Sequence, residues 1–193
     1  MMTLSVLRVL ALEASSLSST FTNHESILIK NVRGWRNTLI RKATTEDLSR
    51  IAEILVFVKR MKYRSIFHND GYSFGNLQVI SVAEEYSDPE ILNKIWVHES
   101  DDIVKGLIHV ENKEIAELYV DYFFQRQGIG SELIEFAQKE HDANFLWTLE
   151  KNQDAIAFYE AHGFRRTGEK QLEEGTTEFI VKMEHYMEVE GEV

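Results

Sequence analysis

The spacing of apolar residues predicts alternating strands and helices from Thr38 onward. Residues 38–42 alternate over a short, β-branched run, as an edge strand does. A threonine pair followed by two acidic residues then marks a helix N-terminus. Because apolar residues next recur every three or four positions, we expect an amphipathic helix over residues 45–60. The aromatic, polar and glycine-bearing segment 63–75 predicts a structured loop.

The remaining pattern continues this alternation to residue 184. A second helix is expected within residues 73–86. Short polar turns separate three strand-like runs, which favours antiparallel hairpins: Ile95–Glu99, Ile103–Val110 and Glu114–Asp121. A glycine-bearing turn and helix, a strand, a helix and two strands follow: Gln125–Gly130, Asn144–Glu150, Asp154–His162, Phe164–Glu169 and Thr177–Glu184. This order predicts an α/β fold, with a mixed sheet covered by helices on both faces.

The chain reads as one domain with distinct ends. Residues 1–37 are rich in Ser, Thr and Leu without a clean period, and form an N-terminal extension that is either loosely held or docks through a short amphipathic helix. Residues 38–185 carry the domain, and residues 186–193 form an acidic tail. We see no internal repeat and no second domain.

Amino-acid composition and net charge exclude several classes of partner and of site. The formal charge of −11 disfavours nucleic acid and anionic membranes as partners and mildly favours a cationic substrate. The absence of cysteine excludes a disulfide framework, a thiolate zinc site and a cysteine nucleophile. No apolar run reaches the roughly 18–20 residues of a membrane span, and Leu4–Leu12 lacks the basic leader of a signal peptide. These features predict a cytoplasmic protein.

The turn Gln125–Ser131 carries the most specific local signal. Its two glycines let the backbone turn tightly and leave amides exposed at a helix N-terminus, which suits a pyrophosphate. Arg126 adds a positive charge. The turn is neither a dinucleotide fingerprint, since Leu133 stands where a third glycine is required, nor a P-loop, since no Gly-Lys-Ser/Thr follows. Taken alone, such a glycine pair can also be merely a tight turn.

Three motifs together resemble the GCN5-related N-acetyltransferase (GNAT) family. They are Glu117-Leu118-Tyr119-Val120-Asp121, the Q-x-x-G-x-G turn at 125–130, and Asn152-x-x-Ala155-x-x-x-Tyr159-x-x-x-Gly163-Phe164. The resemblance covers most of residues 38–185. It implies a single GNAT-like domain with a mixed, mostly antiparallel sheet, whose splayed central strand pair holds acetyl-coenzyme A.

The resemblance also implies which residues bind the cofactor. The amides of the 125–131 turn match those that hold the pyrophosphate, and Leu118 and Val120 match the strand that pairs with the pantetheine arm. Asn152 matches an asparagine that hydrogen-bonds this arm, and Tyr159 matches a tyrosine near the sulfur. The implied set is Leu118, Val120, Gln125, Arg126, Gln127, Gly128, Ile129, Gly130, Ser131, Asn152 and Tyr159. Tyr122 departs from the family, because many members carry proline at that position, so the loop is expected to be less rigid.

Acetyl transfer needs a donor for the oxyanion and a proton for the leaving thiolate. A backbone amide of Leu118 or Val120, where the strands part, is the expected oxyanion donor. Tyr159 is the expected acid for the thiolate, on the strength of the resemblance. Its alternative role is that of a helix aromatic packed on the sheet.

The general base is open among three carboxylates. Glu114 aligns with the base of the histone-acetylating branch of the family, counting back from Gln125. Glu117 directly precedes the pantetheine-pairing segment and points to the opposite face of the strand. Glu150 lies at the end of the neighbouring strand. Each can equally be a solvated carboxylate, and water can relay the proton without any of them.

The acceptor side is less defined by sequence. The resemblance places the region after the first helix beside the acceptor, so Tyr63, His68 and Tyr72 are candidates, with a packed loop as the alternative. The seven histidines show no metal-ligand spacing, so no metal is expected. The expected partner is a small amine or a peptide amine, and the oligomeric state is open, with a homodimer among the options.

Three hypotheses follow from these observations. The leading one is transfer of acetyl from acetyl-CoA to a primary amine by direct attack in a ternary complex. The second is a non-catalytic CoA-binding module that serves regulation or partner docking. The third is an unrelated α/β domain, in which the glycine turn only shapes the backbone and no coenzyme A binds.

Overall fold

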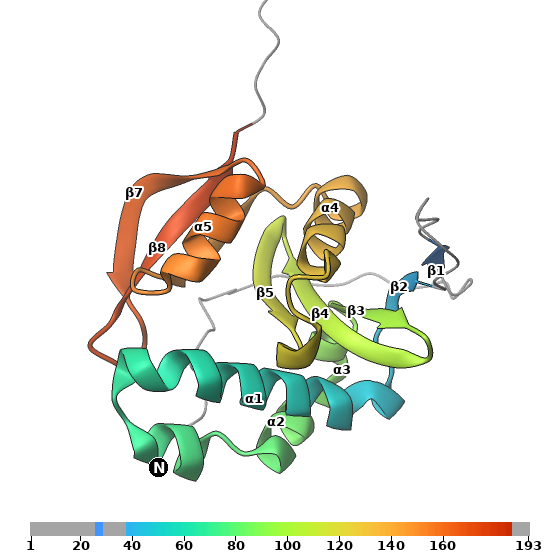
Figure 1. The fold of residues 1–193 in the computed structure, drawn as a ribbon, viewed down its shortest axis with the longest axis horizontal. Helices are drawn as coiled ribbons and strands as arrows, with labels where there is room; N and C mark the ends of the chain where they lie inside the picture. Colours follow the sequence, from blue (N-terminus) through green and yellow to red (C-terminus); the bar gives the residue numbers. More distant parts are fainter. Residues whose placement is uncertain (1–25, 29–37, 187–193) are drawn as a thin grey trace, which may run out of the picture.

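The computed structural model describes residues 26–28 and 38–186, which build one eight-stranded sheet (Figure 1). The order across the sheet is β1-β2-β3-β4-β5-β6-β8-β7. The strands are β1 (Ser26–Leu28), β2 (Thr38–Lys42), β3 (Ile95–Ser100), β4 (Ile103–Glu111), β5 (Glu114–Val120), β6 (Phe145–Leu149), β7 (Phe164–Leu172) and β8 (Phe179–His185). All neighbours are antiparallel except β5 and β6, which run parallel.

Helices cover both faces of this sheet, as Figure 1 shows. They are η1 (Thr45–Asp47), α1 (Leu48–Phe67), η2 (Gly71–Asn76), α2 (Val79–Tyr86), α3 (Pro89–Leu92), η3 (Tyr122–Phe124), α4 (Ile129–His141) and α5 (Gln153–Ala161). One buried cluster joins α1, α2 and α3 to one face, and a second cluster joins α4 and α5 to the other. The alternating strands β4 and β5 therefore bury side chains on both faces.

The sheet splits between β5 and β6. Their ladder pairs only Glu114 with Phe145 and Ile115 with Leu146, after which the strands part. Helix α1 reaches both sides of the split on one face, because Ile66 near its end packs on Leu149 of β6 and Ile180 of β8. The predicted splayed central strand pair is thus present, and it opens toward the carboxyl ends of both strands.

Several local predictions were wrong. Strand β2 is not an edge, because Ser26–Leu28 pairs with it. The first helix runs on to Phe67 instead of ending near residue 60, and the expected loop after it contains the π-helical turn η2. Helix α2 lies within the expected range 73–86, beginning at Val79, whereas the short α3 was missed. Residues 1–25, 29–37 and 187–193 lie outside the described part of the chain, so the domain boundaries stay predictions.

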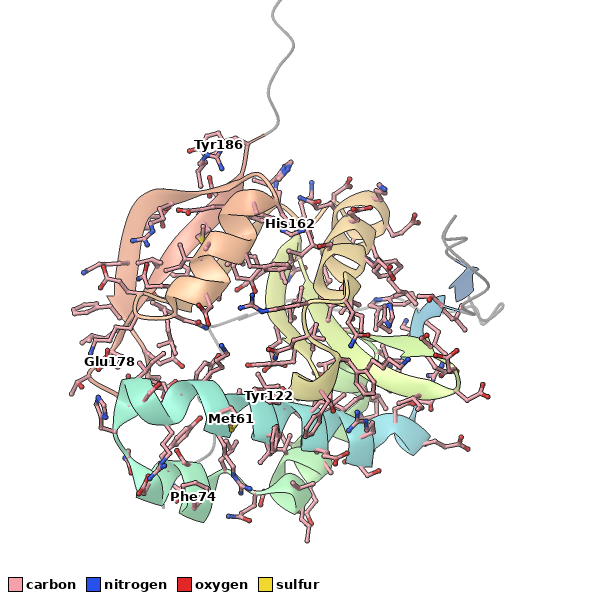
Figure 2. All side chains as sticks on the ribbon, in the orientation of Figure 1. Met61, Phe74, Tyr122, His162, Glu178 and Tyr186 are labelled. Atoms are coloured by element: carbon pink, nitrogen blue, oxygen red, sulfur yellow. The ribbon has the colours of Figure 1, made fainter. Side chains whose placement is uncertain are left out.

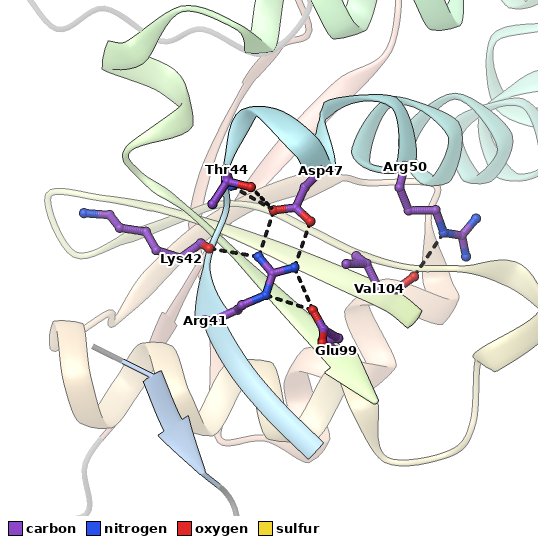
Figure 3. A network of polar contacts seen from close by, with 7 residues as sticks. All are labelled: Arg41, Lys42, Thr44, Asp47, Arg50, Glu99 and Val104. Carbon is purple, nitrogen blue, oxygen red and sulfur yellow. Dashed lines mark hydrogen bonds and ion pairs between the residues drawn. The ribbon is translucent and has the colours of Figure 1, made fainter. Parts of the chain in front are cut away.

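A buried ionic cluster fixes the start of α1 against the sheet (Figure 3). Two nitrogens of the Arg41 guanidinium each lie 2.8 Å from an oxygen of Asp47, and its Nε donates to Glu99 at 2.8 Å. Asp47 also accepts from the amide and hydroxyl of Thr44, at 2.8 and 3.0 Å. The expected acidic N-terminus of the helix is therefore a capping box that is tied to β2 and β3.

We expect Asp47→Ala to lower the free energy of unfolding by about 3 kcal/mol, because it leaves a partly buried guanidinium and the Thr44 donors without their acceptor. Burial alone would raise the pKa of Asp47, yet Arg41 and Thr44 hold that pKa below its ordinary value. The contribution is therefore present above about pH 4, the unfolded-state pKa, and is lost as the pH falls through the folded-state pKa.

Urea denaturation at pH 7 and at pH 3 measures both parts of this expectation. The exposed neighbour Glu46, changed to Ala, is the matched control and should change stability little. Equal stability of Asp47→Ala and Glu46→Ala at pH 7 would contradict the role of the cluster.

Candidate active site

A pocket of about 690 Å³ lies where β5 and β6 part. Its walls come from residues 115–120 of β5, residues 147–149 of β6, the turn after β5, helices α1, α4 and α5, and the β7–β8 end of the sheet. Because the parted strands leave their facing edges without a neighbour here, the pocket is lined partly by backbone. An extended ligand arm can enter such a gap as a missing strand.

Backbone amides face this gap from β5. The Asp121 amide donates to Lys105 of β4 at 2.9 Å, and neighbouring residues of a strand direct their amides to opposite edges. The amides of Leu118 and Val120 therefore point away from β4, toward the parted strand. The Val120 carbonyl accepts from the Gln125 side chain at 3.1 Å, which ties the following turn to the strand.

Side-chain contacts hold the loop after β5, where Tyr122 stands in place of the proline that the resemblance leads one to expect. Asp121 caps η3 by accepting from the Phe123 amide at 2.8 Å, and it also pairs with Arg50 of α1 at 2.6 Å. The Tyr122 ring packs edge-on against Phe57 of α1, with ring centroids 5.8 Å apart. These contacts fix the loop that was expected to be less rigid.

The glycine turn exposes donors at the start of α4. Arg126 and Gly128 have positive φ values of 61° and 92°, and this reversal aims the first amides of the helix outward. Glu132 makes the first helical bond, to Gly128. Among the described residues, nothing accepts a hydrogen bond from the amides of Gly128 to Ser131. Four adjacent donors and the helix dipole make an anion site.

Helix α5 supports this site from the side. A Cβ at Gly130 would lie 3.0 Å from the Phe158 ring, so the glycine permits close packing of α4 on α5. His162 donates from Nδ1 to the Phe158 carbonyl at 2.7 Å, which leaves Nε2 to hold the Ser131 hydroxyl at 2.9 Å. Figure 2 shows His162 at the end of α5 beside α4.

The N-terminus of α5 forms part of the pocket wall. Asn152 caps this helix, with its side-chain oxygen 3.4 Å from the Ala155 amide, and it lines the pocket. Lys62 of α1 and Asp154 of α5 form an ion pair of 2.7 Å, which joins the two helices beside the pocket. The capping bond is a structural role for Asn152 that its match to the family motif did not reveal.

Tyrosine hydroxyls gather at the inner part of the pocket. Tyr159 of α5 is buried, and burial, with a smaller effect from Tyr63, raises its pKa well above the ordinary value. Burial also raises the pKa of Tyr63, which lines the same pocket from α1, to about 12. Both hydroxyls are therefore protonated near pH 7 and can donate a proton.

Glu117 lies on the pocket wall within a network of fixed partners. Its Oε2 accepts from the Tyr86 hydroxyl at 2.5 Å, and its Oε1 lies 3.7 Å from Nζ of Lys59. Nδ1 of His109 lies 3.9 Å from Oε2. Burial by itself would raise the pKa of Glu117, but His109, Lys59 and Tyr86 together hold it below the ordinary value. The carboxylate is therefore ionised and already engaged.

The structure brings most of the expected cofactor residues to one pocket. Those that line it are Leu118, Val120, Gln125, Arg126, Gly128, Gly130, Ser131, Asn152 and Tyr159, together with the candidate base Glu117. Gln127 and Ile129 belong to the same turn but do not line the pocket, and the Ile129 side chain is buried in the core.

Other candidates lie elsewhere. Glu114 sits where β5 still pairs with β6, and burial raises its pKa, but it does not line the pocket. Glu150 pairs with Lys170 at 3.2 Å instead. On the acceptor side Tyr63 reaches the pocket, whereas His68 is exposed at the end of α1. Tyr72 is half-buried nearby, with its ring 5.5 Å from that of Phe67.

Sequence reasoning missed several polar residues of this pocket, among them Glu173, directly after β7, and His162, directly after α5. Both stand beside turns, where an exposed polar residue is the ordinary expectation. No spacing signal distinguishes them, because their position depends on how β7 and α5 pack on the split sheet.

The described residues, 26–28 and 38–186, bear on two further classes of site. In that part of the chain, no three His, Cys, Asp or Glu side chains group as a metal centre requires. None of its helices combines the length and the apolar character needed to cross a bilayer.

Curated relatives share this region. Peptidyl-lysine N-acetyltransferase YiaC of Escherichia coli is 37% identical over 70 residues, which cover 36% of this chain and 48% of that protein. Probable N-acetyltransferase Rv2775 of Mycobacterium tuberculosis is 30% identical over 68% of this chain and 82% of its own length. The 5-NmdU N-acetyltransferase of Pseudomonas phage PaMx11 is 30% identical over 73% of this chain and 96% of that protein.

Solved structures share the fold. The apo form of YjaB from Escherichia coli superposes with a TM-score of 0.63 at 18% identity, covering 77% of this chain and 97% of that one. An N-acetyltransferase from Staphylococcus aureus gives 0.60 at 14% identity, over 75% and 98%. The model of the acetyltransferase (GNAT) domain matches residues 75–186. The chain therefore belongs to the GNAT family of acetyl-CoA-dependent N-acetyltransferases.

Proposed function

We propose that this protein transfers an acetyl group from acetyl-CoA to a primary amine by direct attack, with both substrates bound at once. The observation that carries the proposal is one continuous pocket. It joins the unpaired amides at the start of α4 to the protonated Tyr159 and the carboxylates on its far wall. If the enzyme instead carried the acetyl group on one of its own side chains, acetyl-CoA and the amine would not need to occupy the two ends of the pocket at the same time.

The cofactor lies along the gap. The amides of Gly128 to Ser131 hold the pyrophosphate, and Arg126 adds charge. The pantetheine arm pairs with the free amides of Leu118 and Val120 as a strand would, and the Asn152 side chain closes on the arm. This arrangement aims the thioester between β5 and β6, toward Tyr159.

The chemistry then follows from the groups around the thioester. The amine nitrogen bonds to the carbonyl carbon, and the oxygen that becomes negative accepts from a β5 amide. The carbon–sulfur bond breaks with its electrons on sulfur, and Tyr159 gives that thiolate a proton. The proton lost by nitrogen restores the tyrosine, so the enzyme ends as it began.

The acceptor is an amine that arrives as a cation. Glu117 and Glu173 both line the pocket wall, which favours an ammonium group over an anion. YiaC is a peptidyl-lysine N-acetyltransferase by name, and a lysine side chain presents such an ammonium on a narrow chain. A peptide lysine is therefore the first acceptor to test.

Two measurements test the proposal. Acetyl-CoA at 100 times its dissociation constant should stabilise the fold by about 2.7 kcal/mol, which appears as a rise in Tm. Mixing acetyl-CoA with a lysine peptide of blocked termini should then release thiol and add one acetyl mass to the peptide.

The two outcomes separate the alternatives. No rise in Tm would contradict a cofactor site altogether. A rise in Tm without thiol release across a broad panel of amines would favour a non-catalytic CoA-binding module instead.

A further inference from the structure

A buried carboxylate outside the family motifs faces the pocket. Glu173 stands directly after β7, in the connection to β8, and its backbone amide donates to the Glu178 carbonyl at 2.8 Å. The Thr176 amide and hydroxyl both donate back to the Glu173 carbonyl, at 3.1 and 3.0 Å. The backbone is thus fixed, and the side chain lines the pocket with the residue only 4% exposed.

The Glu173 carboxylate differs from that of Glu117 in its partners. Among the described residues, no side chain or backbone group donates a hydrogen bond to it. Burial, which Lys59 opposes only in part, raises its pKa above the ordinary value. The Glu173 oxygens are not among the fully enclosed polar atoms without a partner, so they open on the pocket and are placed to accept a hydrogen bond from a ligand there.

The surroundings of Glu173 define the chemistry of that ligand. The carboxylate lies close enough to Tyr63 and Tyr72 to raise their pKa values further, beyond the larger effect of burial. A cation between these groups is attracted by the negative charge of the carboxylate and also by the faces of the aromatic rings. Val58, Leu149 and Ile180 line the same pocket, so the neighbouring walls are apolar.

We propose that Glu173 receives the ammonium group of the acceptor and takes a proton from it, and that the acceptor is a primary amine on a narrow apolar chain. The inference rests on the proposed function and names its acceptor group. One N–H bond breaks, the proton moves to the carboxylate, and the neutral amine keeps the lone pair that attacks the thioester. The proton later passes to solvent.

Glu117 is less suited to this step, because Tyr86, Lys59 and His109 already surround it. The fixed negative charge of Glu117 instead balances the positive charge of Lys59, so that Lys59 does not cancel the negative charge of Glu173 in full. Among the described groups, Lys59, Tyr63, Tyr72 and the neighbouring Glu174 interact electrostatically with Glu173. Glu117 on β5 and Tyr159 on α5 are titratable groups that line the same pocket.

The test compares Glu173→Gln with Glu174→Gln, its exposed neighbour in the same turn. With the lysine peptide at pH 7, Glu173→Gln should lower kcat/KM on the order of 10²-fold, and Glu174→Gln should not. The deficit should shrink toward pH 10, because a free amine of pKa about 10.4 then arrives unprotonated. Both variants should keep the affinity for acetyl-CoA.

A second readout does not depend on turnover. Binding of n-butylamine at pH 7 to the protein loaded with CoA, followed by NMR titration, should weaken at least about tenfold in Glu173→Gln, as loss of a charge pair implies. The Tm of the variant should stay equal or rise, since an unpaired buried charge is removed.

The outcomes separate this inference from the proposed function. Wild-type turnover that survives in Glu173→Gln at every pH would overturn the inference alone. Butylamine that binds wild type and Glu173→Gln equally, or binds neither, would overturn it as well. Amine binding that needs Glu173, without any acetyl transfer, would uphold the amine site and remove the proposed function.

Discussion

Gly128→Glu is expected to weaken acetyl-CoA binding by about 100-fold or more. The glutamate places a negative charge beside the amides proposed to hold the pyrophosphate and blocks part of the approach to them. Loss of two charge-assisted hydrogen bonds at about 1.5 kcal/mol each corresponds to this factor. Calorimetric titration with acetyl-CoA measures it directly.

Backbone strain needs its own control, because Gly128 has a φ of 92° and any L residue is strained there. Gly168 offers a close match. Its φ is 91°, and a Cβ there, as at Gly128, would meet nothing within 4 Å. Gly168→Glu should therefore lose similar stability and keep cofactor affinity. Equal affinities of the two variants would show that the phosphate site is misassigned.

Tyr159→Phe should lower kcat on the order of 10²-fold while the affinity for acetyl-CoA stays nearly unchanged. The hydroxyl is the only group removed, and burial keeps it protonated at the working pH because its pKa is raised. The ring keeps its packing against Phe158 and Phe164, so the fold should persist. Steady-state rates of thiol release at saturating substrates provide the measurement.

Two tyrosine variants complete this experiment. Tyr186→Phe, at an exposed position, should leave the rate unchanged. Tyr63→Phe tests the neighbouring hydroxyl of the same pocket. If Tyr63→Phe loses the rate and Tyr159→Phe does not, the proton donor is Tyr63 and the proposed role of Tyr159 is refuted.

Local sequence patterns predicted most of the fold, since strands β2 to β6 and β8 alternate or run apolar between polar turns. The end of α1 was not predicted. Tyr63, Ile66 and Phe67 stand at helical spacing, but the aromatic, polar and glycine-bearing composition of residues 63–75 favoured a loop, and Ile66 is held by Leu149 and Ile180, which are distant in sequence. Strand β1 is three residues long and depends on its pairing with β2, so its own residues carry little signal.

The two ends of the candidate site differ in how far local sequence predicts them. The phosphate end is encoded locally, because Gly128, with a φ of 92°, shapes the turn that leaves the first amides of α4 open. The acceptor end is assembled from separate elements, so Glu173 reads in sequence as an ordinary turn carboxylate. Only the packing of the β7–β8 end against α1 brings it beside Tyr63.

The split sheet has a mechanical consequence. Since the ladder between β5 and β6 pairs only two residues of each strand, few backbone bonds join the two halves of the sheet. Side-chain packing under α1 and the Lys62–Asp154 pair joins them beyond that point. If the gap widens, side-chain contacts under α1 and one ion pair are disturbed, but no strand ladder has to break.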